Sequence, residues 1–265
     1  MLSYCSDLLS VASGAFIGFT LGLIGGGGTI LAVPLLIYVV GVASPHMAIG
    51  TSAVAVAASA AVNLLAHARA RTVEWGHAAV FGLSGITGAA AGAMLGKMMD
   101  GRHLLALFGG LMAVIGLANL RLPTPDHSGA RRAPANAVGL LPKLIGTGHV
   151  VGALAGFFGI GGGFLIVPAI MLGSGMTTIN AVGTSLVSVG LFGLTTAATY
   201  ALAGLVDLRI AAVFVAGGII GGLVGVKLSV RLAAQRGTLT RVFATIVIAV
   251  ALFVIWKSLT AGHLV

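Results

Sequence analysis

Residues 25–34 read GGGGTILAVP, and residues 159–168 read GIGGGFLIVP. The two segments share six of ten positions, including three glycines and the final proline. A glycine cluster interrupts a helix, because each helix-interior glycine costs about 1 kcal/mol relative to alanine. In lipid, the freed backbone groups must be satisfied by protein or by a water-filled cavity. Each cluster therefore predicts a turn between two short apolar helices, one hairpin over 8–41 and the other over 144–174.

The correspondence continues on the C-terminal side of both segments. AIGTSAV at 48–54 aligns with AVGTSLV at 181–187, and AAVF occurs at both 78–81 and 211–214. Between them, Val73-Glu74 aligns with Val206-Asp207. A shared proline, GTS triplet and acidic pair in the same order predict an internal duplication. We place the first repeat at 1–120, a polar linker at 121–142 and the second repeat at 143–265.

Charge is scarce and unevenly distributed. Only 7% of the 265 residues are charged, against about 25% in a soluble domain, and mean hydropathy is +1.13. No Asp, Glu, Lys or Arg occurs in 8–68 or in 144–206, two runs of nearly equal length. Since one span takes about 20 residues, we expect an all-α integral membrane protein. Each repeat would comprise a short-helix hairpin and three transmembrane helices.

The basic residues indicate topology. An odd number of crossings in each repeat would invert the second repeat relative to the first. With the linker in the cytoplasm, ten of the 14 Lys and Arg residues lie inside, as the positive-inside rule requires, which favours inversion with both termini outside. The net charge of +9 comes from scattered residues, so nucleic-acid binding is not expected. The N-terminal stretch lacks the Lys or Arg of a cleavable signal, so the first apolar segment is expected to remain.

Inverted repeats with broken helices are typical of secondary transporters, which bind substrate near the membrane midplane. Glycine turns present backbone N–H groups and helix N-termini, whose partial positive charge suits an anion. The predicted substrate-binding residues are Gly25, Gly27, Gly28, Thr29, Thr51, Ser52, Asn63, Gly159, Gly161, Gly162, Gly163, Thr184 and Ser185. The alternative is tight helix packing at the glycines, with hydroxyls bonded to the preceding turn and Asn63 joining two helices.

The acidic residues argue against a cation substrate. All five carboxylates fall at the ends of apolar segments or in loops, whereas cation transporters place one at depth. Glu74 and Asp207 could gate opposite mouths of the pathway, or simply favour the N-terminal dipole of a helix. Pro34 and Pro168 are expected to break or kink the second helix of each hairpin.

Other chemistry has no support in the sequence. The seven histidines show no metal-binding spacing, and the single cysteine, Cys5, excludes an internal disulfide. No nucleophile, base and acid share a plausible depth in the membrane. We expect no metal, no cofactor and no enzymatic activity.

The doubled glycine motif with Pro34 and Pro168, each followed by a GTS triplet at 50–52 or 183–185, resembles the TauE/SafE sulfite exporter family. The resemblance runs from about residue 14 to 256. It implies a prokaryotic inner-membrane permease for sulfite, sulfoacetate, another organosulfonate or a related sulfur-containing anion. The glycine turns and nearby GTS hydroxyls would form its substrate region. Thr29 replaces the third glycine of the first copy, and Arg71 stands where the second copy has Gly204.

The expected partners are a small anionic substrate and the lipid bilayer. An anion channel, or a transporter of a different small solute or metal ion, remains an alternative. A channel would carry sustained current without substrate saturation. The sequence leaves open the direction of transport, a coupling ion such as proton or sodium, homo-oligomer formation, and whether the hairpins fully cross the bilayer.

Overall fold

The computed structural model describes residues 2–24, 26–121, 137–176, 178–231 and 236–260, and every regular element in these ranges is helical. The first half contains α1 (Leu2–Ile24), η1 (Gly26–Leu31), α2 (Ala32–Leu35), η2 (Leu36–Val40), α3 (Pro45–Arg69), α4 (Trp75–Met98) and α5 (Gly101–Arg121). The second half contains α6 (Ala137–Phe158), α7 (Gly163–Ser174), α8 (Thr178–Ala201), α9 (Leu208–Arg231) and α10 (Arg236–Thr260). The all-α prediction is confirmed.

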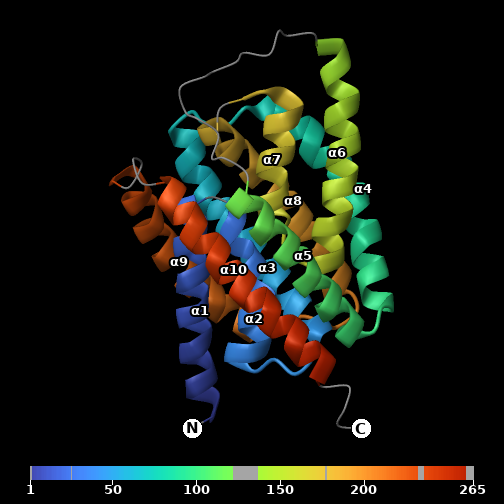
Figure 1. Cartoon of the computed structure of the whole chain (residues 1–265), viewed down its shortest axis with the longest axis vertical. Helices are drawn as coiled ribbons and strands as arrows, with labels where there is room; N and C mark the ends of the chain where they lie inside the picture. Colours follow the sequence, from blue (N-terminus) through green and yellow to red (C-terminus); the bar gives the residue numbers. More distant parts are fainter. Residues whose placement is uncertain (1, 25, 122–136, 177, 232–235, 261–265) are drawn as a thin grey trace.

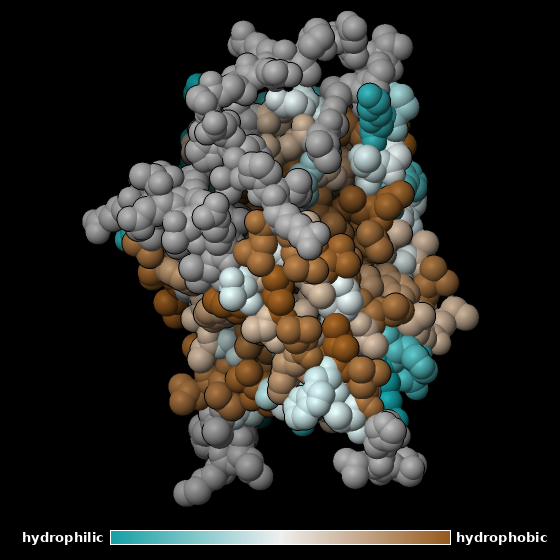
Figure 2. Space-filling model, viewed as in Figure 1, coloured by the Kyte–Doolittle hydropathy of each residue, from teal (hydrophilic) through white to brown (hydrophobic). Residues whose placement is uncertain are grey.

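Seven helices in the described part of the chain are long and apolar enough to span a membrane. They are α3, α4, α5, α6, α8, α9 and α10; the shorter apolar helices are Ser6–Gly22 and Gly28–Val40. Large apolar side chains such as Leu83, Leu95 and Leu252 are about 60% exposed. Figure 2 shows hydrophobic residues across the middle of one face. Such a surface is stable in lipid, so the chain is a multi-pass membrane protein.

Helices from the two halves of the chain pack against each other. α1 contacts α9, α4 contacts α6, α3 contacts α8, and α5 contacts α10. Glycines allow the first two pairs to approach closely: a Cβ added at Gly14 of α1 would overlap the carbonyl oxygen of Phe214 in α9. A Cβ at Gly152 of α6 would likewise overlap the carbonyl oxygen of Gly85 in α4. Much of the glycine content therefore serves close helix packing.

α3 and α8 form the centre of the molecule. Their apolar segments are 67% and 61% buried, whereas those of the other five spanning helices are 44% buried or less. α3 begins at Pro45, where the Ser44 side chain caps the helix by accepting a hydrogen bond from the Met47 N–H at 3.5 Å. Both helices carry fully buried hydroxyls, which directs attention to the space between them.

The two hairpins lie toward opposite ends of the molecule. α1 begins and α10 ends at one end of the long axis, and α6 begins at the other (Figure 1). α2 lies toward the first end and α7 toward the second (Figure 1). Most of the predicted linker falls outside the described residues; its two ends are Arg121, which closes α5, and residues 137–142, which open α6.

Candidate functional site: two buried glycine turns

The second glycine turn connects α6 to α7. Gly159, Gly161 and Gly162 have φ of +67°, +62° and +66°, a left-handed conformation that favours glycine. The turn is also confined in space. A Cβ at Gly159 would overlap the Ile49 side chain, and one at Gly161 would lie 2.7 Å from Cγ1 of Val56 and 3.2 Å from Cγ1 of Val189. The break predicted at this cluster is present, and it lies between α3 and α8.

α7 starts inside the protein. Gly163 is its first residue, and the carbonyl of Gly162 accepts hydrogen bonds from the N–H groups of Leu165 and Ile166 at 2.8 and 2.9 Å. The N-terminus of this 12-residue helix therefore faces the buried turn. The partial positive charge of a helix N-terminus suits an anion.

The first glycine turn has a different geometry. Gly27 and Gly28 lie in η1, a 3-10 helix, and Gly25 lies outside the described residues. Gly28 packs against α1, where a Cβ would overlap Oγ1 of Thr20 and lie 2.8 Å from the Leu21 nitrogen. Thr29, which replaces a glycine of the second copy, is fully buried. The two matched clusters therefore make dissimilar turns.

The two turns meet. η1 contacts both α7 and α8, while the Ser52 hydroxyl of α3 lies 2.9 Å from the carbonyl oxygen of Ile49 and 3.3 Å from that of Gly159. A seam of backbone groups, helix ends and hydroxyls thus occupies the interior between the two halves. Such a seam can hold a small anion through neutral donors.

The two GTS triplets bind to the opposite halves of the chain. The Thr51 hydroxyl accepts a hydrogen bond from the backbone N–H of Asp207, and the Thr184 hydroxyl accepts one from the N–H of Glu74, both at 3.0 Å. The Ser185 hydroxyl donates to the carbonyl of Val182 at 2.8 Å. Ser185 thus bonds to the preceding turn, as in the packing alternative, whereas Thr51 and Thr184 bind the backbone of the opposite half.

The triplet glycines provide close approach at the same places. A Cβ at Gly50 would overlap the carbonyl oxygen of Leu205, and one at Gly183 would lie 2.7 Å from that of Thr72. Leu205 and Thr72 each precede the acidic residue of their half by two positions. In both triplets, therefore, the glycine admits the opposite backbone and the threonine binds it.

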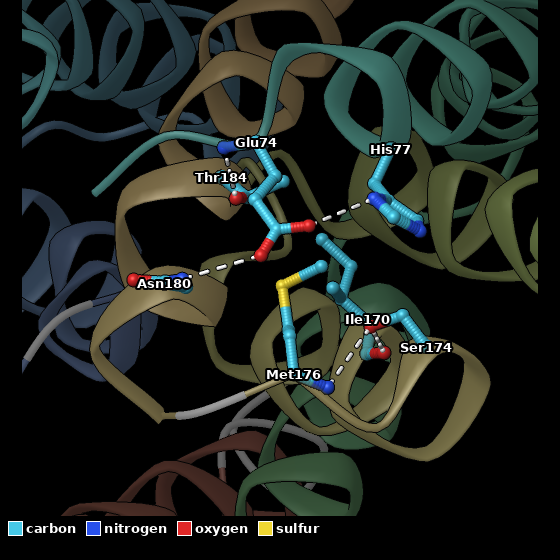
Figure 3. A network of polar contacts seen from close by, with 7 residues as sticks. All are labelled: Glu74, His77, Ile170, Ser174, Met176, Asn180 and Thr184. Carbon is cyan, nitrogen blue, oxygen red and sulfur yellow. Dashed lines mark hydrogen bonds and ion pairs between the residues drawn. The ribbon is translucent and has the colours of Figure 1, made fainter. Parts of the chain in front are cut away.

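Glu74 is the centre of a polar network at one end of α8. Its carboxylate lies 3.0 Å from Nδ1 of His77 and accepts a hydrogen bond from Nδ2 of Asn180 at 3.2 Å. Figure 3 shows Glu74 between these two side chains, with Thr184 behind it and the end of α7 alongside. The Ser174 hydroxyl donates to the Ile170 carbonyl at 2.7 Å there. The network joins α4 to the start of α8.

Asp207 has simpler surroundings. Its Oδ1 accepts a hydrogen bond from the Ile210 N–H at 3.0 Å, which caps α9. Positions 210 and 47 hold Ile and Met where the other half has His77 and Asn180. Since the 24-residue α8 separates the two acidic residues, they lie at opposite ends of the bundle. Of these two acidic residues, only Glu74 has an imidazole beside its carboxylate in the described part of the chain.

The other described carboxylates also lie away from the glycine turns. Asp7 pairs with Arg209 at 2.6 Å on an exposed surface. Asp100 accepts a hydrogen bond from the Arg102 N–H at 2.8 Å, and this bond holds the pKa of the carboxyl below its ordinary value. Among the described residues, no three His, Cys, Asp or Glu side chains cluster as metal ligands.

Asn63, Pro34 and Pro168 are also predicted to be important, and each lies in a different part of the structure. Asn63 donates to the Ser59 carbonyl at 2.9 Å and lines a cavity between α3 and α9, not the glycine turns. Pro34 is buried in α2, between the 3-10 helix η1 and the π-helical turn η2. Pro168 lies inside α7, which continues past it. The chain around Pro34 is thus irregular, whereas α7 runs through Pro168 as one continuous helix.

Residues 10–254 match the family described as "Sulfite exporter TauE/SafE". The chain belongs to this family. The resemblance seen in the doubled glycine motif is confirmed, and the chain is a membrane transporter of the TauE/SafE family.

The relatives span the same length. A "Probable membrane transporter protein" of Xylella fastidiosa strain 9a5c is 51% identical over 254 residues, which cover 96% of each chain. The "Probable membrane transporter protein YunE" of Bacillus subtilis strain 168 is 28% identical over 272 residues, 96% of this chain and 99% of the relative. No solved structure was found to match the chain.

Sequence reasoning missed two buried hydroxyls of this transporter. Ser188 and Tyr200 of α8 are fully buried, and within the described ranges neither hydroxyl has a hydrogen-bond partner. A Cβ at Gly96 would lie 3.1 Å from the Tyr200 hydroxyl, which places that hydroxyl where α4 crosses α8. A lone Ser or Tyr in an apolar helix gives no local signal, so only the three-dimensional packing identifies them.

Proposed function

We propose that this TauE/SafE protein is a secondary transporter of a small sulfur-containing anion, such as sulfite, sulfoacetate or another organosulfonate. The main support is the packing of η1, which carries the first glycine turn, against α7, whose N-terminus lies buried at the second glycine turn. Helix N-termini and backbone N–H groups stabilise an anion without a buried cation. No described carboxylate lies among these groups to repel the anion. We propose a permease rather than an enzyme.

The transporter would use two inverted repeats and alternating access. The pairing of helices supports this, because the contact of α1 with α9 corresponds to that of α6 with α4 when the two halves exchange roles. The glycine contacts correspond as well: Gly18 meets the Gly218 carbonyl, and Gly152 meets the Gly85 carbonyl. The register that aligns the two glycine clusters also aligns Gly18 with Gly152, and the register of the GTS triplets aligns Gly85 with Gly218. Two similar halves facing opposite ways can exchange conformations around a fixed site.

The predicted residues would have three roles: binding the anion, lining its site and gating the pathway. Gly159, Gly161, Gly162 and Gly163, with Gly25, Gly27, Gly28 and Thr29, would hold the anion, and Thr51, Ser52, Thr184 and Ser185 would line its surroundings. Glu74 and Asp207 would gate opposite ends, since each is tied through its backbone N–H to the triplet of the other half. Breaking one of these bonds at a time would open one end at a time.

The site of action would be the inner membrane of a bacterium, as the bacterial relatives suggest. The side on which both termini lie would be extracytoplasmic, because ten of the 14 basic residues then face the cytoplasm.

A thermal-shift screen of the purified transporter tests the proposal. An anion that binds only the folded state raises stability, by about 2.7 kcal/mol at 100 times its Kd. We expect sulfite, sulfoacetate or a related sulfonate to raise the unfolding temperature, and chloride at equal ionic strength to have no such effect. A shift from metal cations that persists when all sulfur anions are omitted would contradict the anion assignment.

A further inference from the structure

A cavity of about 200 Å³ lies between α3 and α9. It is lined by Ser59, Val62, Asn63, Ala66, Gly218, Ile219, Gly222, Leu223 and Lys227. Because α3 belongs to the first half and α9 to the second, the cavity lies on the boundary between the two halves. One water takes roughly 30 Å³, so the space accommodates a small organic molecule.

The corresponding space, between α8 and α4, is filled. The register that aligns the GTS triplets also aligns Ser59 with Phe192 and Gly85 with Gly218. The Phe192 ring packs on Gly85, where an added Cβ would overlap it, and lies 6.2 Å from the Phe81 ring. Ser59 is much smaller than Phe192, so the α3–α9 boundary stays open where the α8–α4 boundary is closed. The transporter is therefore asymmetric at this level.

The polar groups of the cavity suit an anion. Lys227 carries a positive charge on an exposed side chain, two residues beyond the apolar segment Leu208–Gly225. Asn63 is only 8% exposed. Its amide has two N–H donors, and one of them binds the Ser59 carbonyl in the described part of the chain. No second hydrogen bond of this amide occurs among the described residues, so its other N–H is available to a ligand.

The walls of the cavity are apolar. Val62, Ile219 and Leu223 surround the polar groups. An inorganic oxyanion would lose hydration against these side chains without gaining a matching contact, whereas a short carbon chain gains about 0.8 kcal/mol for each buried CH₂. The combination of a cation, an amide and apolar walls matches an organic anion with one charged end.

The cavity also lies close to the first glycine turn. A Cβ at Gly222 would be 3.6 Å from the Gly18 carbonyl oxygen and from Asn63 Nδ2. Two residues after Gly18 on α1, Thr20 lies against Gly28 of η1. The Gly222 wall of the cavity therefore borders the part of α1 that packs near the first glycine turn.

We propose that the α3–α9 cavity is an entry site for the transported anion, in which Lys227 attracts the charged group and Asn63 donates to it. The site prefers a short-chain organosulfonate to inorganic sulfite. This inference rests on the proposed anion transport and adds a substrate class and a route.

Cysteine labelling tests the entry site. Cys5→Ser removes the single native cysteine, and Val62→Cys then places one thiol in the cavity wall. The probes are 2-sulfonatoethyl methanethiosulfonate, itself an alkylsulfonate, and its trimethylammonium analogue. Both reagents are applied to permeabilised membranes. The rate at which each labels the protein thiol is divided by its rate of reaction with a free thiol in solution, which corrects for intrinsic reactivity. Thr195→Cys, at the position that the GTS register aligns with Val62, is the matched control. Ile219→Cys is a second reporter if Val62→Cys folds poorly.

We expect the sulfonate reagent to label Val62→Cys faster than the trimethylammonium reagent does. Ethanesulfonate should protect this thiol from labelling better than sulfite does. Lys227→Gln, at an exposed position, should lower the preference about fivefold. Thr195→Cys should show neither preference nor protection. The inference is overturned if no sulfonate protects Val62→Cys while proteoliposomes still transport sulfonates, because the proposed function then stands without this site. Protection by anionic phospholipid vesicles alone would assign the cavity to a lipid and would also overturn it. If both protection and transport are absent, the proposed function fails as well.

Discussion

The Thr51 hydroxyl of α3 accepts a hydrogen bond from the backbone N–H of Asp207, 156 positions away, at 3.0 Å. The corresponding Thr184 of α8 accepts one from the N–H of Glu74, 110 positions away, at the same distance. Each half of the transporter thus holds the segment that precedes a spanning helix of the other half. The GTS triplets therefore act as joints, each bonding one half of the protein to the other, whatever they contribute to substrate binding.

Removing one of these joints should destabilise the fold. Thr51→Val keeps the shape of the side chain but leaves the partly buried Asp207 N–H without its acceptor, at a cost of about 1 kcal/mol. We expect a lower unfolding temperature for Thr51→Val and for Thr184→Val in purified protein. Thr51→Ser retains the hydroxyl and is the control. Equal unfolding temperatures for Thr51→Val and the wild type would show that the bond contributes nothing.

The second glycine turn should tolerate no side chain. Gly161→Ala forces a non-glycine residue into φ of +62°, which costs about 1–2 kcal/mol, and places a Cβ 2.7 Å from Val56. We expect lower stability and a loss of anion-dependent thermal shift. Gly190→Ala of α8 is the matched control, since an added Cβ there has no neighbour within 4 Å. That change should be neutral or stabilising, because alanine favours a helix. Similar losses in both variants would refute the specific role of the turn.

The Glu74 network should affect function more than stability. The Glu74–His77 pair is 39% and 30% exposed at its side chains, and ion pairs of this kind contribute about 0–1 kcal/mol. Glu74→Gln should therefore leave the unfolding temperature within about 2 °C of the wild type while changing the anion flux. Asp207→Asn tests the opposite end in the same way. An unchanged flux in both variants would remove these residues from gating.

Tyr200 offers a test of its buried hydroxyl. Within the described residues this hydroxyl has no partner, and burying an unsatisfied polar group is unfavourable. Tyr200→Phe should leave the unfolding temperature unchanged or raise it. Thr196→Val, which removes a hydroxyl that donates to the Phe192 carbonyl at 2.8 Å, is the comparison and should not be stabilising. A clear loss of stability in Tyr200→Phe would reveal a partner for this group.

The parts of the fold that depend on local pattern could be predicted from the sequence. Apolar length identifies the helices, and glycine clusters identify the breaks. The left-handed backbone at Gly159, Gly161 and Gly162 is a conformation that glycine adopts most easily. The 3-10 geometry of η1 was not predictable in this way, since Thr29 and the packing of Gly28 on α1 make the first turn unlike the second.

The other features that could not be predicted from the sequence depend on long-range contacts. The binding of Thr51 to Asp207 depends on how α3 approaches α9, which no local pattern encodes. Asn63 lies on the same helix as Ser52, but about three turns further along it. It therefore lines the α3–α9 cavity, whereas Ser52 reaches Gly159. Residues on one helix of a membrane protein can thus belong to different sites.

Uptake of labelled sulfoacetate and sulfite into proteoliposomes tests the central claim most directly, with the wild type and the Gly161→Ala variant compared at equal amounts of folded protein. We predict saturable uptake of at least one of these anions by the wild type, competition by unlabelled sulfonates, and strongly reduced uptake by Gly161→Ala. Uptake no greater than in protein-free liposomes, or flux that never saturates, would contradict a transporter that carries sulfur anions through its glycine turns.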